Sequence, residues 1–189
     1  MKKFRLLFDG IDTAPALDQL RAHPELWAAV PQRLTVPDSP HVESQDIWLR
    51  FRNKGELQEP ADYGAPHFAE FWPAWHLLPG LHPVVFDAMR AVEAVYLGGC
   101  LITKIPPGAS IHPHIDHGWH PTFNNCKVYI ILQANPECVN YCEDEHVKMR
   151  AGEAWMFRND IVHSVENNGA TDRIAVICTM RVERELWPT

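Results

Sequence analysis

Residues 112–116 read His-Pro-His-Ile-Asp, and residues 160–166 read Asp-Ile-Val-His-Ser-Val-Glu. Arg173 follows ten residues after His163. The flanking residues alternate as in β-strands. Successive side chains of an extended strand point to opposite faces, so His114 and Asp116 project to the same side and both can reach one metal ion. The imidazole of His163 completes two nitrogens and one carboxylate oxygen, a ligand set typical of non-haem Fe(II) with open positions. We therefore predict a metal site at His114, Asp116 and His163.

An anion-binding residue is expected beside this site. The second motif ends in the turn signal Asn-Asn-Gly at 167–169, and the strand-like run 172–182 follows. A β-hairpin with this turn would lay Arg173 near His163. The planar guanidinium matches a carboxylate, so Arg173 is expected to hold the far end of a dicarboxylic acid whose near end chelates the metal. A salt bridge to Glu166 across the hairpin is the structural alternative.

These motifs carry a family resemblance. Residues 113–116, the segment Gly152–Phe157, His163 and Arg173 together resemble the Fe(II)/2-oxoglutarate-dependent oxygenases and, among them, the aspartyl/asparaginyl β-hydroxylase family. The likeness extends over residues 96–183 and includes Asn-Cys-Lys at 125–127. It implies a hydroxylase that uses Fe(II), O2 and the co-substrate 2-oxoglutarate, with Arg173 on the 5-carboxylate. Animal members of the family carry glycine where Asp116 stands, so the resemblance transfers the chemistry and leaves the substrate open.

The rest of the chain predicts a mainly β fold around the site. Short β-type runs recur from Ala94 onward, a spacing typical of a sandwich or barrel. With the resemblance, we expect a double-stranded β-helix, or jelly roll, over residues 95–183. Residues 1–94 are expected to support it within a single domain, 1–189. They contain a strand at 3–8 and helical patterns at 13–28, 67–78 and 82–94.

Two further strands supply candidate binding residues. In the run 46–52, strand alternation places Trp48 and Arg50 on the same face, where they would supply an aromatic wall and a cation for an anionic substrate. The alternative is a strand whose two arginines, Arg50 and Arg52, are simply solvated. In the run 126–133, Lys127 and Tyr129 share a face and are candidates for contact with 2-oxoglutarate, against simple packing.

The sequence also allows other sets of metal ligands. His112 also shares a face with His114, so a cupin-type His-x-His site without 2-oxoglutarate competes with the chosen ligands. Cys138, Cys142 and His146 have a zinc-like spacing but lack an evident fourth ligand. A non-catalytic ligand-binding barrel is the third class, and residues 31–44 predict a loop over the mouth of the site.

Composition narrows the partners and the compartment. The chain has 189 residues, a formal charge of −7 and a pI near 5.8, which argue against nucleic acid or an anionic membrane as the main partner. Its five cysteines are odd in number and lie in apolar runs, as expected of reduced thiols in the cytoplasm. The expected substrate is an amino acid, a peptide or protein side chain, or a small metabolite.

Overall fold

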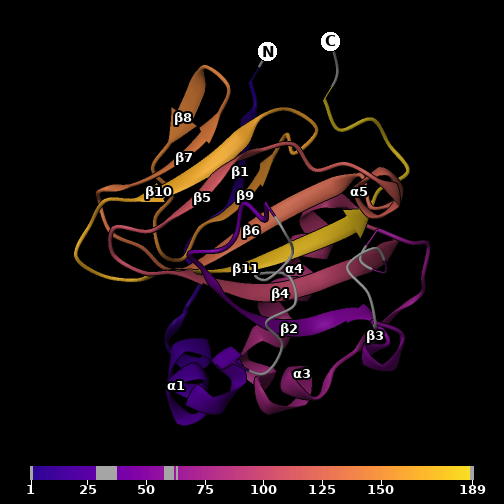
Figure 1. The fold of residues 1–189 in the computed structure, drawn as a ribbon, viewed down its shortest axis with the longest axis horizontal. Coiled ribbons are helices and arrows are strands. Elements are labelled where there is room, and N and C mark those ends of the chain that lie inside the picture. The colour runs from indigo at the N-terminus through magenta and orange to yellow at the C-terminus, as the bar shows by residue number, and fades with distance from the viewer. Residues whose placement is uncertain (1, 29–37, 58–61, 63, 188–189) are drawn as a thin grey trace.

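The structure, a computed structural model, describes residues 2–28, 38–57, 62 and 64–187 and is built mainly of β-strands (Figure 1). In chain order the strands are β1 Phe4–Phe8, β2 Gln45–Arg52, β3 Ala69–Phe71, β4 Tyr96–Ile105, β5 Ser110–His114, β6 Cys126–Gln133, β7 Cys138–Cys142, β8 Glu145–Val147, β9 Ala154–Phe157, β10 His163–Asn167 and β11 Arg173–Arg181. The helical segments are α1 Ala14–Ala22, η1 Pro24–Ala28, η2 Lys54–Glu56, α3 Pro73–Leu77, η4 Pro79–Leu81, α4 His82–Val92 and α5 Trp119–Phe123.

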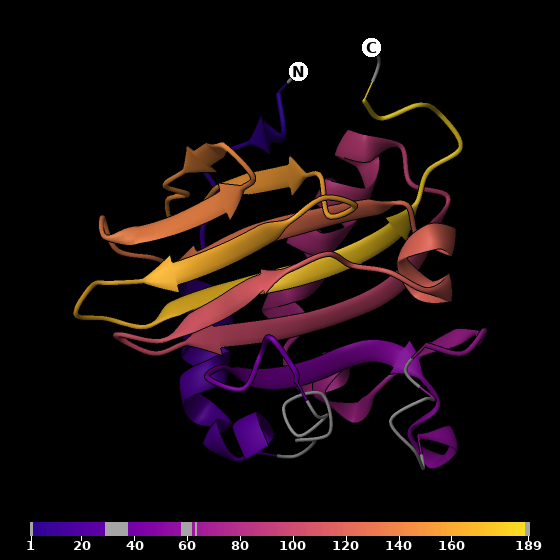
Figure 2. The same cartoon turned by 45° about the horizontal axis from the view of Figure 1, so that its top comes forward.

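The strands form two antiparallel sheets that lie face to face (Figure 2). The seven-stranded sheet has the order β1-β9-β6-β11-β4-β2-β3, and the four-stranded sheet has the order β5-β10-β7-β8. Strands from the first part of the chain therefore extend both edges of the larger sheet rather than only supporting it. Helices α1, α3 and α4 cover the outer face of that sheet. No helix among the described residues is long and apolar enough to cross a membrane.

Strand β6 separates the two hydrophobic cores because its side chains alternate. Val128 and Ile130 belong to the core between the larger sheet and the helices. Tyr129 and Ile131 belong to the core between the two sheets. The predicted alternation of this strand is confirmed, and the inner face it creates is the one that meets the site residues of the smaller sheet.

Two observed elements, β3 and α5, differ from what the sequence led us to expect. Residues 69–71 form strand β3 at the sheet edge, and the helix begins only at Pro73, because proline fits the first turn of a helix and no position within one. The short helix α5 was not predicted. The expected loop at 31–44 lies partly outside the described residues; its part from 38 to 44 lies against β5, where the amide of His112 donates to the carbonyl of Pro40 (2.9 Å).

The predicted hairpin between β10 and β11 is wrong. Strand β10 pairs with β5 and β7 in the smaller sheet, whereas β11 pairs with β4 and β6 in the larger one. The intervening turn therefore crosses between the sheets. Asn167 holds this crossing, since its side-chain amide donates to the carbonyls of Ile105, Pro106 and Thr171 at 2.8–3.1 Å. A turn signal in the sequence does not distinguish a hairpin from such a crossing.

The turn before β9 gives a stability prediction. Gly152 has φ +84°, and a Cβ atom there would lie 3.0 Å from the carbonyl oxygen of Ile11. We expect Gly152→Ala to lower the free energy of unfolding by about 1–2 kcal/mol from the left-handed backbone alone, and by more through the contact. Urea unfolding measures it. Gly108→Ala is the matched control, because Gly108 has φ +77° and no atom within 4 Å of the added Cβ. Equal losses in both variants would contradict a role for the Ile11 contact.

Candidate metal centre

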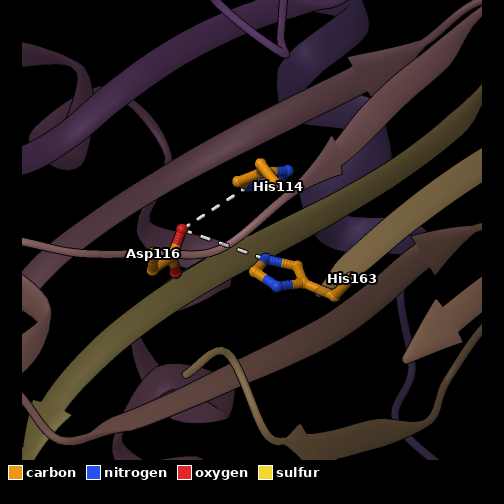
Figure 3. A group of neighbouring side chains, drawn as sticks. All are labelled: His114, Asp116 and His163. Atoms are coloured by element: carbon orange, nitrogen blue, oxygen red, sulfur yellow. Dashed lines mark ion pairs between the residues drawn. The ribbon is translucent and has the colours of Figure 1, made fainter. Parts of the chain in front are cut away.

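Neighbouring strands of the smaller sheet bring three candidate ligands together (Figure 3). His114 ends β5, His163 begins β10, and the antiparallel register places these two residues opposite each other. Asp116 follows two positions after the end of β5, where its amide donates to the carbonyl of Asn159 (3.0 Å). One ligand atom from each of His114, Asp116 and His163 lies within 4.8 Å of the others.

The two imidazoles present their Nε2 atoms to the same point. The Nδ1 atom of His114 lies 2.8 Å from the carbonyl of His112, and that of His163 lies 3.0 Å from the carbonyl of Ile161. Because a carbonyl only accepts, each Nδ1 carries the proton and each Nε2 keeps its lone pair. Both Nε2 atoms are buried, lie 3.5 and 3.9 Å from Oδ1 of Asp116, and have no hydrogen-bond partner in the part of the chain that the structure describes. Buried nitrogens of this kind fit a metal ion, and a two-His, one-carboxylate set suits Fe(II).

The carboxylate of Asp116 is held from its other side. Its Oδ2 accepts from the ammonium of Lys127 at 2.5 Å and from the side-chain amide of Asn159 at 2.8 Å. The Lys127 side chain is only 7% exposed. Lys127 was expected at the co-substrate, and that contact stays a prediction; Asn159 was not anticipated at all.

The electrostatics keep Asp116 and His163 in their metal-binding forms near neutral pH. Burial opposes a charge on Asp116, but Lys127 and the two histidines outweigh it and hold its pKa well below the usual range. Burial, aided by the Lys127 charge, lowers the pKa of His163 to about 4. The carboxylate is therefore ionised and the His163 imidazole neutral, which are the forms that bind metal.

A buried arginine lies further inside, between the two sheets. Arg173 is 1% exposed, and its guanidinium lies 4.8 Å above the ring of Tyr129. Nη2 donates to Oδ1 of Asn140 at a long 3.4 Å, and Nη1 has no hydrogen-bond partner within the described ranges. The alternative salt bridge is absent, because Glu166 instead accepts from Tyr141 and Asn168 and no described carboxylate forms an ion pair with Arg173.

A sequence match to the aspartyl/asparaginyl beta-hydroxylase family covers residues 48–183, more than half of the chain. The chain belongs to this family. No sequence among the curated proteins matches it.

Solved structures agree on the fold of this hydroxylase-family chain. A prolyl hydroxylase from Trichoplax adhaerens, in complex with a hypoxia inducible factor peptide fragment, is 12% identical with a TM-score of 0.58, covering 95% of this chain and 84% of its own. A viral collagen prolyl hydroxylase from Paramecium Bursaria Chlorella virus-1 is 10% identical with a TM-score of 0.57, covering 97% of each chain. At such identities the likeness concerns the fold alone, and it confirms the predicted double-stranded β-helix.

The expectation that Trp48 and Arg50 share a face of β2 is wrong. Trp48 lies opposite Leu101 of β4, but Arg50 lies opposite the next residue, Cys100, so Leu49 is an extra residue in the ladder. Such a bulge reverses the alternation beyond it. Trp48 consequently lies in the core between the two sheets. Arg50 instead points to the same face of the larger sheet as its neighbour Cys100, which belongs to the core between that sheet and the helices.

Arg50 has partners of its own on that side. Its Nε donates to the carbonyl of Leu97 at 2.7 Å, and its guanidinium lies 4.5 Å above the ring of Phe71. The bulge also moves Phe51 to the inner face beside Trp48, with ring centroids 4.7 Å apart. Trp48 therefore stays a candidate wall of the site, while nothing in its geometry brings Arg50 there.

Two histidines that were not predicted as site residues, His41 and His120, lie near the candidate metal ligands. The ring of His41, on the segment against β5, meets the ring of His114 edge-on with centroids 5.1 Å apart. His120 of α5 stacks on His67 at 5.4 Å, and its Nε2 lies 2.8 Å from Oγ1 of Thr179. Only the crowding of histidines at 112–120 hinted at His120, and the sequence held no signal for His41.

The competing ligand sets find no support among the described residues. His112 is half exposed, and its Nε2 lies 3.6 Å from a carboxylate oxygen of Glu43, away from the triad. Cys142 lies with its Sγ 3.2 Å from the carbonyl of Arg158, and neither Cys138 nor His146 joins it in a metal-sized group.

Proposed function

We propose that the protein is an Fe(II)- and 2-oxoglutarate-dependent dioxygenase that hydroxylates an unactivated C–H bond of an amino acid or a peptide side chain. Family membership supports hydroxylation in general. The observation that carries the finer proposal is Arg173, a buried cation that has no carboxylate partner among the described residues and has one guanidinium nitrogen unpaired among them. A buried charge without a counter-ion is costly, so an anionic ligand is the natural partner.

The residues have distinct tasks in this proposal. His114 and His163 through Nε2, and Asp116 through Oδ1, would hold the metal. Arg173 would donate to the 5-carboxylate of 2-oxoglutarate, and the Tyr129 ring, 4.8 Å from the guanidinium, packs against it as a cation–π partner. Bound Fe(II), with 2-oxoglutarate and O2, supplies the oxidation that inserts oxygen into the C–H bond.

Two observations bear on the substrate class. Trp48 and Phe51 offer an aromatic inner surface to a side chain. The prolyl hydroxylase of Trichoplax adhaerens has the same fold and was solved with a peptide fragment, so this fold can accept a peptide. We therefore include peptide side chains beside free amino acids.

The decisive experiment is an anaerobic titration of 2-oxoglutarate into the Fe(II)-loaded protein, followed by the absorbance of the metal chelate. Arg173→Ala removes charge-assisted hydrogen bonds worth roughly 1.5–3 kcal/mol, so we expect about 10- to 100-fold weaker binding. Arg173→Lys should recover only part of the loss, because an ammonium does not reproduce the planar pair of donors. Metal binding should persist in both variants.

Arg50→Ala is the matched control, because it removes an arginine that the structure places on the other side of the sheet. Its affinity for 2-oxoglutarate should equal that of the wild type. If wild type, Arg173→Ala and Arg173→Lys bind 2-oxoglutarate equally well, the proposal fails in favour of a cupin-type metal enzyme. In that case we also expect the protein to release no succinate and to add no oxygen atom to any substrate.

A further inference from the structure

The two oxygens of Asp116 have different surroundings. Oδ1 faces the unpaired Nε2 atoms of His114 and His163 at 3.5 and 3.9 Å. Oδ2 is occupied by the ammonium of Lys127 and the amide of Asn159. The residue is also fixed at its backbone, where its amide donates to the carbonyl of Asn159.

We propose that Lys127 and Asn159 are positioning residues that reserve Oδ2, so that Asp116 offers a metal ion Oδ1 alone. This inference rests on the proposed function. A carboxylate that chelates through both oxygens occupies one more coordination position than a carboxylate that binds through one. An oxygenase needs that position, because co-substrate and O2 must both reach the metal beside three protein ligands.

The surroundings of Lys127 fit this role better than contact with 2-oxoglutarate. Strand β6 places its side chain on the inner face, opposite Thr179 of β11 and Phe157 of β9. The ammonium lies 5.7 Å from the Phe157 ring centre and is paired with Asp116. An ammonium this deeply buried needs its carboxylate partner, so the lysine and the ligand hold each other in place.

Metal affinity tests the proposal without turnover. We expect Lys127→Met and Asn159→Ala each to bind Co(II) about 10- to 100-fold more weakly than the wild type, as is usual when a partner of a metal ligand is removed. Lys104→Met is the matched control, since the Lys104 ammonium lies over the ring of Trp27 at 4.5 Å. Unchanged Co(II) binding in Lys127→Met would overturn the proposal. Circular dichroism verifies that each variant is folded.

Rescue by formate separates positioning from general support of the fold. Asp116→Gly removes the carboxylate but leaves the Lys127 ammonium and the Asn159 amide, which should seat formate in its place. We expect formate to tighten Co(II) binding of Asp116→Gly about 10-fold, and to leave Asp116→Gly/Lys127→Met and Asp116→Gly/Asn159→Ala unchanged. Equal rescue in the single and double variants would show that these two residues do not seat the carboxylate.

The two proposals fail in different ways. If the wild type binds no Co(II) or Fe(II), the proposed function falls together with this inference. If the wild type binds metal and 2-oxoglutarate but Lys127→Met retains its metal affinity, only the positioning role falls.

Discussion

We expect His163→Ala to weaken binding of Fe(II) by more than about 100-fold and to leave no metal on the purified protein. His163 is 3% exposed, and its Nε2 atom is unpaired and lies 3.9 Å from Oδ1 of Asp116. Alanine removes one of the three candidate ligands, and each ligand contributes several kcal/mol to a typical metal site. Metal analysis of the purified protein and a Co(II) titration measure the effect.

His112→Ala is the control for this result. His112 lies two positions before His114 but is half exposed and faces Glu43, and its backbone carbonyl, which orients His114, is unaffected by the substitution. It should bind one metal ion per chain like the wild type. Full metal content in His163→Ala, with loss in His112→Ala, would show that the His-x-His pair is the real site.

The metal-free protein should lose stability as the pH falls from about 6.5 toward 4. Burial lowers the pKa of both His120 and His163 from 6.5 to about 4, with further contributions from nearby charges. In that pH range each of these histidines is protonated in the unfolded chain but stays neutral in the folded chain. The stability present above pH 6.5 is therefore lost on acidification. Each shift corresponds to a loss on the order of 3 kcal/mol. Urea unfolding between pH 7 and pH 4.5 measures the sum.

His120→Gln isolates one of these protons. Glutamine does not titrate, and its amide can still donate to the Thr179 hydroxyl that His120 contacts. The variant should show a smaller loss of stability over the same pH range, with the other groups facing this position, namely His67, Lys127 and Asp116, left in place. An unchanged pH dependence would mean that His120 is not held neutral by the fold.

Local sequence patterns were sufficient for the features that depend on near neighbours. The alternation of β6 follows from side-chain direction in a strand, so the inner placement of Lys127 and Tyr129 was predictable. His114 and Asp116 were expected on one side by the same rule and do lie together, but Asp116 stands two positions beyond the end of β5 and is fixed by its amide bond to Asn159 rather than by strand alternation. The choice of His163 as their partner came from its order in the chain and from the family resemblance, and the structure places it within reach of both.

Features that depend on distant segments were not predictable. A single extra residue, Leu49, reversed the face of Arg50, because a bulge is set by the fit of β2 to β4 rather than by either strand alone. The turn at 167–169 looked like a hairpin, but Asn167 fixes a crossing between sheets by bonding carbonyls some sixty positions earlier.

The sequence by itself determined most of the strand pattern and the His-x-Asp motif at 114–116, because each is encoded in residue type and short spacing, and the order of its motifs along the chain indicated the family. Only the tertiary structure decided what those side chains face. It paired Lys127 with Asp116, left Arg173 buried without a carboxylate from the described part of the chain, and brought Asn140 from the other sheet to one arm of that guanidinium. The physical reason is that such partners are chosen by the packing of two sheets, which no local rule of side-chain direction contains.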